Sequence, residues 1–159
     1  DQLAGFTLNV STYAAAAPGV KSIKDRPDVK INTSFLSDDA FIEEFDRSAY
    51  VVLPYDKAYE GKTSGILCDA ITTGTPIIAP NFAPFSSLFE EYGAFGFLVD
   101  FETGQGFPSH ADLTDEVAYR TFQINMRQIV VDNSPEAIAC QFHHAFSVQN
   151  LLRLNEIAN

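Results

Sequence analysis

Short apolar runs alternate with longer segments of helical periodicity along most of this chain. The apolar runs predict strands at Phe6–Val10, Val29–Thr33, Tyr50–Leu53, Ile77–Ala79 and Phe97–Val99. Strands that alternate with helices are typical of βαβ units around a parallel sheet. The pattern therefore predicts the α/β class, and more closely a three-layer α/β/α Rossmann-like domain with a parallel sheet of about five or six strands.

Helix starts and stops are marked by capping residues. We expect helices to begin at Ser37 with Asp38 and Asp39, at Thr63 or Ser64, at Ser86, at Thr114 and at Ser134 with Pro135. Gly74 and Gly93 end the second and third of these helices. The segment Ser11–Gly19 is either a short helix or a loop, and Phe101–Asp112 is expected to be the longest loop.

Apolar spacing within these helices predicts which side chains face the core. The expected core positions are Phe41, Ile42, Phe45 and Ala49; Ile66, Leu67, Ala70 and Ile71; and Val117, Phe122, Ile124, Ile129 and Val130. Cys68 is expected to be a small buried thiol in the same apolar helix.

The stretch from Tyr50 to Asp100 carries the strongest functional signal, because it reads as strand, polar loop, helix and strand. Ligands bind open α/β sheets at the carboxyl edge of the strands, where such a loop lies. A helix start offers free N–H groups and a positive dipole end, which suit a phosphate. We therefore expect the loop Pro54–Ser64 and the helix start to form one wall of the main cleft, on the same edge as the turn Thr33–Leu36.

Three segments of this stretch resemble a known family. Ala49–Tyr55, Ser64–Ala70 and Gly74–Ala79 occur in the order and spacing of the donor-binding, C-terminal half of GT-B glycosyltransferases, especially the retaining group called family 4. Upstream, Val29–Phe45 is similar to the same group. Downstream, Phe146–Leu152 is similar to its closing helix, with Val148 where tryptophan is usual.

The resemblance implies a function for residues 1–159 as one nucleotide-sugar-binding domain of a larger, two-domain enzyme. That enzyme would transfer a sugar from a nucleotide-diphosphate donor to a glycan, lipid-linked or other acceptor. Its N-terminal acceptor domain would be missing from this chain, so the chain alone is expected to be inactive. The first strand of the C-terminal half, with its cationic loop, would also be absent.

The resemblance also implies roles for individual residues. The donor diphosphate would sit on the N–H groups of Ser64, Gly65 and Ile66, and Asp69 would bind the ribose hydroxyls. Glu60 would orient the sugar and is the expected catalytic residue. The family usually has two glutamates eight positions apart, whereas this chain has Asp69 and, eight positions before it, Gly61, with Glu60 one step out of register. Further nucleotide-sugar contacts are expected from Tyr55, Lys62 and Ser34.

The amino-acid composition argues against two classes of binding partner, nucleic acids and the membrane interior. The net charge of −11 argues against nucleic-acid binding, which needs a basic surface. No apolar run reaches the roughly 20 residues of a membrane span. We expect no metal and no cofactor other than the donor, and a cytoplasmic location, either free or at the membrane surface through the parent protein. The two cysteines, Cys68 and Cys140, fit no metal spacing.

Two alternatives remain open. One is a non-catalytic, degenerate GT-B module for assembly or regulation, and the other is a nucleotide-sugar epimerase or phosphorylase on the same scaffold. Three weaker signals are interpreted as structural. Gly104–Gly106 is expected to be loop, and the adjacent His143 and His144 would make a poor metal pair. Ser109–Asp112 are neighbours along the chain that lack triad geometry.

Overall fold

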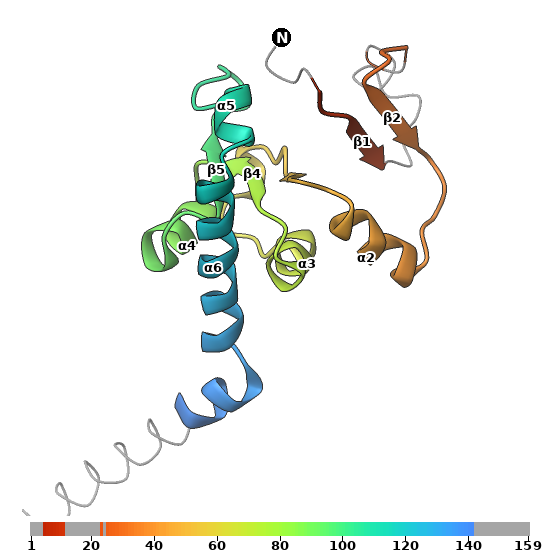
Figure 1. The fold of residues 1–159 in the computed structure, drawn as a ribbon. Coiled ribbons are helices and arrows are strands. Elements are labelled where there is room, and N and C mark those ends of the chain that lie inside the picture. The colour runs from red at the N-terminus through yellow and green to blue at the C-terminus, as the bar shows by residue number, and fades with distance from the viewer. Residues whose placement is uncertain (1–4, 12–22, 24, 142–159) are drawn as a thin grey trace, which may run out of the picture.

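The computed structural model of the protein describes residues 5–11, 23 and 25–141 (Figure 1). In chain order the elements are β1 Leu8–Ser11, β2 Val29–Asn32, α2 Asp38–Asp46, β3 Val51–Val52, the 3-10 turn η1 Lys57–Tyr59, α3 Gly65–Thr73, β4 Ile77–Pro80, α4 Phe85–Tyr92, β5 Gly96–Val99, α5 His110–Leu113 and α6 Glu116–Asp132. Residues 135–141 are helical as well. All five predicted strands are present, with ends shifted by one or two residues.

The strands form two parallel sheets. One contains β1 and β2, and the other has the order β3-β4-β5. The protein is thus of the α/β class with small parallel sheets, whereas the expected single sheet of five or six strands is not formed among the described residues. Within the described ranges β1 pairs with β2 alone and β3 with β4 alone, so no hydrogen bonds join the two sheets.

The main core packs against the β3-β4-β5 sheet. Helices α2, α3, α4 and α6 contribute to it, and β4 points Ile77 and Ala79 into it. The neighbouring residue Ile78 points to the opposite face, because successive strand residues alternate. There it joins Val99 and Leu113 in a second, smaller cluster that Phe6 borders. Within the described part of the chain, the four-residue helix α5 and the residues before β1 cover this smaller cluster.

Most predicted helix starts are confirmed by their caps. The Ser37 and Ser64 hydroxyls accept hydrogen bonds from the N–H groups of Ala40 and Leu67. The predicted cap at Thr114 is wrong by one residue, because Asp115 caps α6 with bonds from Val117 and Ala118.

The reason for this shift is an additional short helix. Ser109 and Asp112 form a reciprocal capping box that starts α5 inside the expected loop Phe101–Asp112. Thr114 ends α5, and its N–H group and hydroxyl both donate to the carbonyl of His110. The pair Ser109 and Asp112 is therefore structural, as the sequence indicated.

Several residues expected in the core are exposed instead. Among them Ile66 is 40% and Val117 77% exposed, and the others are Ile42, Ala49, Cys68, Ile124 and Val130. A helix buries only the face that meets a neighbour, and for α3 this is the face of Leu67, Ala70 and Ile71.

Some expectations lie outside the described residues. They concern the segment Ser11–Gly19 beyond Ser11, the pair His143 and His144, and the closing segment Phe146–Leu152. Within the part of the chain that the structure describes, no helix is long and apolar enough to span a membrane.

Candidate functional site

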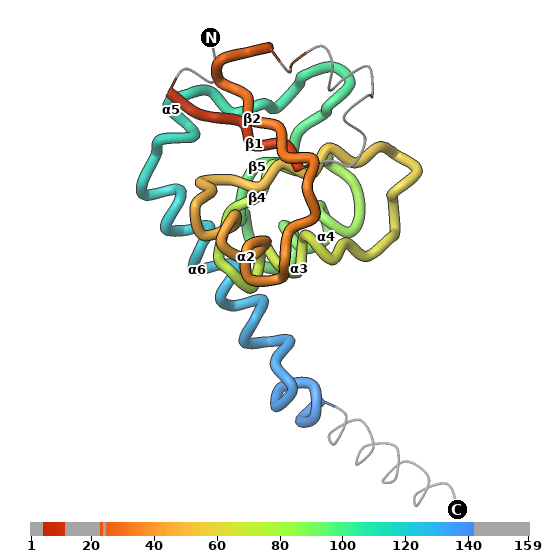
Figure 2. The backbone as a smooth tube through the Cα atoms, turned by 90° about the vertical axis from the view of Figure 1, so that its right-hand side faces the viewer, coloured from red at the N-terminus to blue at the C-terminus, as the bar shows by residue number. Residues whose placement is uncertain are grey.

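The candidate site lies at the start of α3, where the loop that follows β3 ends. In Figure 2 the tube leaves β2 (orange) and β3 (gold) on the same right-hand side. The turn after β2 and the loop before α3 therefore share the carboxyl edge of the strands, as the sequence predicted. Ser34 lies in that turn and donates its N–H to Asn32 Oδ1 at 2.9 Å, which makes a tight local turn.

Ser64 is the anchor of this helix start. Its side chain is almost fully buried, with 1% of the residue exposed. Its Oγ accepts a hydrogen bond from the N–H of Leu67 at 3.1 Å and lies 3.0 Å from the hydroxyl oxygen of Tyr55. The hydroxyl of Ser64 is therefore committed to holding the helix start.

An aromatic stack fixes the loop against the helix. Tyr55 lies face to face with Tyr59, with ring centroids 4.0 Å apart and planes 12° apart, and its other side lies 6.0 Å from the ring of Phe85. The hydroxyl of Tyr59 donates to the carbonyl of Thr63 at 2.8 Å. Because stacked rings and two hydroxyl bonds tie both ends of the loop, its backbone is held in one conformation.

Gly61 occupies a position in this loop whose backbone conformation favours glycine. Its φ of 75° is in the left-handed region, where an acidic side chain is disfavoured. Its N–H donates to the carbonyl of Ala83 at 3.0 Å, which joins the loop to the turn before α4. Glu60, the preceding residue, forms an ion pair with Lys57 at 3.0 Å, and Lys57 lies 5.5 Å from the ring centroid of Phe82.

Gly65 leaves open space above the first turn of α3. A Cβ built on this glycine would meet no atom within 4 Å, so the backbone of the helix start is accessible. Asp69 lies four residues later, on the same side of the helix and about 5–6 Å away. Its side chain is half-buried and forms no hydrogen bond or ion pair with another residue in the described ranges. Gly65 and Asp69 thus present backbone donors and a carboxylate on one face.

Ile66 and Lys62 complete the surroundings of this face. The N–H of Ile66 belongs to the first turn of α3, whose first N–H groups have no partner within the helix. The Lys62 ammonium lies 5.9 Å from the ring centroid of Tyr59, on the same loop. The structure therefore brings Tyr55, Glu60, Lys62, Ser64, Gly65, Ile66 and Asp69 into one loop and helix start, with Ser34 on the same edge.

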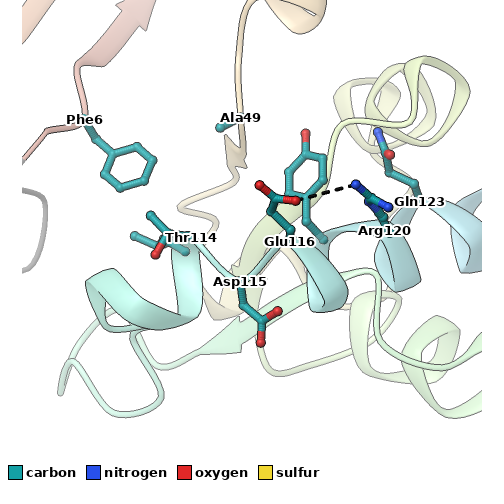
Figure 3. Close-up of a pocket in the computed structure, with 9 residues that line it drawn as sticks. Phe6, Ala49, Thr114, Asp115, Glu116, Arg120 and Gln123 are labelled. Atoms are coloured by element: carbon teal, nitrogen blue, oxygen red, sulfur yellow. Dashed lines mark ion pairs between the residues drawn. The ribbon is translucent and has the colours of Figure 1, made fainter.

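Two hollows lie elsewhere in the part of the chain that the structure describes. One hollow of about 580 Å³ lies at the other end of the strands, and another of about 480 Å³ lies between the end of α3 and α6. The first is lined by Phe6, Ala49, Leu113, Thr114, Asp115, Glu116, Tyr119, Arg120 and Gln123 (Figure 3). The lining of neither hollow includes the loop Pro54–Ser64, and the prediction that this loop forms one wall of the main cleft stays a prediction.

Sequence reasoning missed the first hollow and the residues around it. Glu116, Tyr119, Arg120 and Gln123 follow the helical spacing of three and four, so a polar face on α6 was the available signal. Beside it, the hydroxyl of Tyr50 lies 3.3 Å from the carbonyl oxygen of Leu113, to which it donates. Burial, followed by the neighbouring Tyr119, Asp115 and Asp112, raises the pKa of Tyr50 to about 12.

No cluster of side chains suited to a metal ion occurs within the described ranges. Comparison with models of protein families, with curated protein sequences and with solved structures finds no match for this chain.

Proposed function

We propose that this chain is the donor nucleotide-sugar-binding domain of a glycosyltransferase. The observation that carries the proposal is the open backbone at Gly65, at the carboxyl edge of a parallel sheet. One turn away lies the carboxylate of Asp69, for which no partner occurs among the described residues. The N–H groups at the start of α3 would bind the diphosphate, and helix polarity would stabilise the leaving nucleoside diphosphate. Asp69 would accept hydrogen bonds from the ribose hydroxyls.

The proposal extends to the finer fold and to the parent protein. The two parallel sheets with their helices would belong to a three-layer Rossmann-like domain, and sugar transfer would need a second, acceptor-binding domain. The protein would act in the cytoplasm, with no metal, and Tyr55, Lys62 and Ser34 would border the donor. Glu60 would orient the sugar, which requires its carboxylate to leave Lys57.

The decisive experiment adds a side chain where the diphosphate would lie. The Cβ that either Gly65→Ala or Gly65→Val adds lies in open space, and circular dichroism of both variants checks that the fold is kept. Calorimetry with uridine and guanosine diphosphates and their sugar conjugates should show weak binding to the wild type. Affinity should fall with Gly65→Ala and disappear with Gly65→Val. Equal affinity in all three proteins would reject the helix start as the phosphate site.

Asp69 gives a second, independent test of the same site. Asp69→Ala should weaken binding of the nucleoside diphosphate by about 1.5–3 kcal/mol, because a charged hydrogen-bond acceptor is lost. Asp69→Glu should be tolerated, since it keeps the carboxylate with a longer reach. Inorganic pyrophosphate is the control ligand, and its affinity should not depend on Asp69. If the ribose-bearing ligand also binds Asp69→Ala as tightly as wild type, the ribose role is wrong.

One observation favours a second candidate, a non-catalytic donor-binding module. The Glu60 carboxylate is already paired with Lys57, and the Ser64 hydroxyl is committed to the helix cap. A module of this kind would bind nucleotide but would gain nothing from Glu60. Sugar transfer by the full-length parent with Glu60→Gln separates the two candidates. Loss of transfer supports the enzyme, and transfer equal to that of the unchanged parent supports the module.

A further inference from the structure

Helix α6 presents a row of apolar side chains to solvent. Val117 is 77% exposed, Ile124 63% and Val131 60%. These residues are seven positions apart, which is close to two helical turns, so they lie along one side of the helix. The buried side chains of α6 face the main core on the opposite side. Because exposed apolar residues that form a continuous row are typical of binding surfaces, this row marks a second packing face of α6.

A groove beside α6 continues this row. Figure 1 shows α3 next to α6, and the two helices are in contact. The hollow of about 480 Å³ lies between them, and it is lined by the end of α3, Ile71–Gly74, and by Gln123, Arg127, Val130 and Val131 of α6. Val131 belongs to both the row and the hollow, so the two form one surface. We call this surface, from Val117 to Val131 with the end of α3, the α6 groove.

The positive charge beside the row lies on one side of it. Arg120 and Arg127 each follow a residue of the row by three positions, so both lie on the same side, and Arg127 lines the hollow. On the other side, Thr121 and Gln128 are uncharged. The Arg120 guanidinium lies 3.5 Å from the Glu116 carboxylate, whereas Arg127 forms no ion pair within the described ranges. An occupant with carboxylates along one flank therefore complements this surface.

A second copy of the chain would not supply these carboxylates. If two α6 helices met along the row in opposite directions, about a two-fold axis at Ile124, Arg127 of each copy would meet Arg120 of the other. If they met in the same direction, the arginine side of one copy would face Thr121 and Gln128 of the other. Like charges repel in the first arrangement, and the arginines gain no ionic partner in the second. The charge pattern thus favours a different, acidic helix over self-association.

We propose that the α6 groove binds an amphipathic α-helix of a separate protein, with apolar residues on one face and aspartate or glutamate along one edge of that face. The apolar face covers the exposed row, one large side chain enters the hollow beside Val130, and the acidic edge pairs with Arg127. At 1.5 Å per residue the row spans about 21 Å, so the bound helix has about four turns. The groove lies at the opposite end of α3 from Gly65, and the inference does not rest on the proposed function.

The test measures binding of designed helical peptides to the full chain. The probe is a fluorescently labelled peptide of about 20 residues, with leucine spaced alternately by three and four positions and glutamate along one flank of the leucines. One control peptide has lysine at each glutamate position, and another has the composition of the probe in scrambled order. Fluorescence anisotropy is measured in about 0.15 M salt, where a Debye length of about 8 Å largely screens the net charge of −11.

We expect the glutamate peptide to bind at least roughly tenfold more tightly than either control peptide. Arg127→Glu should reverse the preference, so that the lysine peptide binds more tightly than the glutamate peptide. Ile124→Asp should weaken binding of the glutamate peptide roughly tenfold or more, because it places a charge in the apolar row. The matched control is Ile42→Asp on α2, which changes another exposed isoleucine and should keep the wild-type affinity. Circular dichroism checks that all three variants are folded.

Three results would overturn the proposal. The first is a glutamate peptide that binds no better than the scrambled peptide, and the second is an affinity that Ile124→Asp leaves unchanged. The third is a preference for glutamate that persists in Arg127→Glu, because the charge would then act elsewhere on the protein. Sedimentation of the chain without peptide tests the alternative occupant. A dimer that Ile124→Asp converts to a monomer would assign the row to a second copy instead.

Discussion

Tyr50 is a residue whose chemistry is decided by its surroundings rather than by its neighbours in sequence. It begins the apolar run of β3, and its ring meets Phe97 at 5.8 Å and Tyr119 at 5.6 Å. Its hydroxyl donates to the Leu113 carbonyl. Burial is the largest cause that raises the pKa of Tyr50 from the ordinary 10.0 to about 12. The folded protein therefore holds this proton more tightly than the unfolded chain does.

This raised pKa predicts a loss of stability at high pH. The contribution of neutral Tyr50 is fully present below pH 10, the unfolded pKa, and is lost as pH rises through about 12. Denaturant unfolding should show the free energy of unfolding falling between these values. Tyr50→Phe should be less stable at neutral pH by about 1 kcal/mol, from the lost hydrogen bond, but should fall less steeply above pH 10.

A tyrosinate absorbance titration provides the independent readout for Tyr50. The wild type should show one more tyrosine titrating near pH 12 than Tyr50→Phe does. Superimposable titrations above pH 10 would show that the hydroxyl of Tyr50 is not held neutral by the fold.

At the scale of elements, β4 and β5 approach each other so closely that one position tolerates no side chain. Gly96 opens β5, and a Cβ built there would lie 1.9 Å from the carbonyl oxygen of Ile77. The obstacle is backbone of the neighbouring strand, so no side-chain rotation can relieve it. Ile77 itself is fully buried in the main core, which prevents β4 from moving away.

Gly96→Ala and Gly65→Ala should therefore have opposite effects on stability. Gly96→Ala should destabilise the protein by about 3 kcal/mol, since the two strands must separate or the core must shift. Gly65→Ala is the matched control, because its Cβ meets no atom and alanine favours a helix by up to about 1 kcal/mol. Urea unfolding measures both changes. A Gly96→Ala protein as stable as wild type would contradict the strand spacing.

At the scale of the whole molecule, charge limits what an anionic ligand can gain. The net charge of −11 repels a nucleoside diphosphate at long range, while the helix start and Lys62 attract it locally. In about 0.1 M salt the Debye length is about 10 Å, so the long-range repulsion is already largely screened. Above that salt concentration, the main electrostatic interaction is the local attraction between the ligand's phosphates and the helix start with Lys62.

Two whole-chain measurements follow from this balance and from the proposed function. Binding of nucleoside diphosphate should be weak and should fall further as salt rises above about 0.1 M. The 159-residue chain should transfer no sugar, because the proposed chemistry occurs between two domains. A transfer assay with radiolabelled donor and mixed acceptors checks the second point. Labelled product would contradict the view of the chain as one half of an enzyme, and affinity that rises with salt would contradict the local anion site.

The sequence by itself determined most of the elements and many of their ends, although α5 and η1 were not predicted. Local capping and spacing were sufficient, because Ser37, Ser64 and Gly74 act within their own helix turns. The apolar runs located all five strands of the described residues, because a buried strand is apolar along its own length. The sequence also grouped Tyr55 to Asp69 into one site, since a loop and the helix that follows it are joined covalently and stay together in any fold.

Tertiary structure alone decided how these elements meet. The buried face of a helix depends on the elements that pack against it, and the local sequence does not identify those elements. Ile66 and Val117 are therefore exposed although their spacing predicted burial. The aromatic contact between Tyr55 and Phe85 joins residues 30 positions apart in the sequence. The division of the strands into two sheets was equally hidden, because strand pairing is set by contacts between distant segments, and apolar periodicity records burial but not partners.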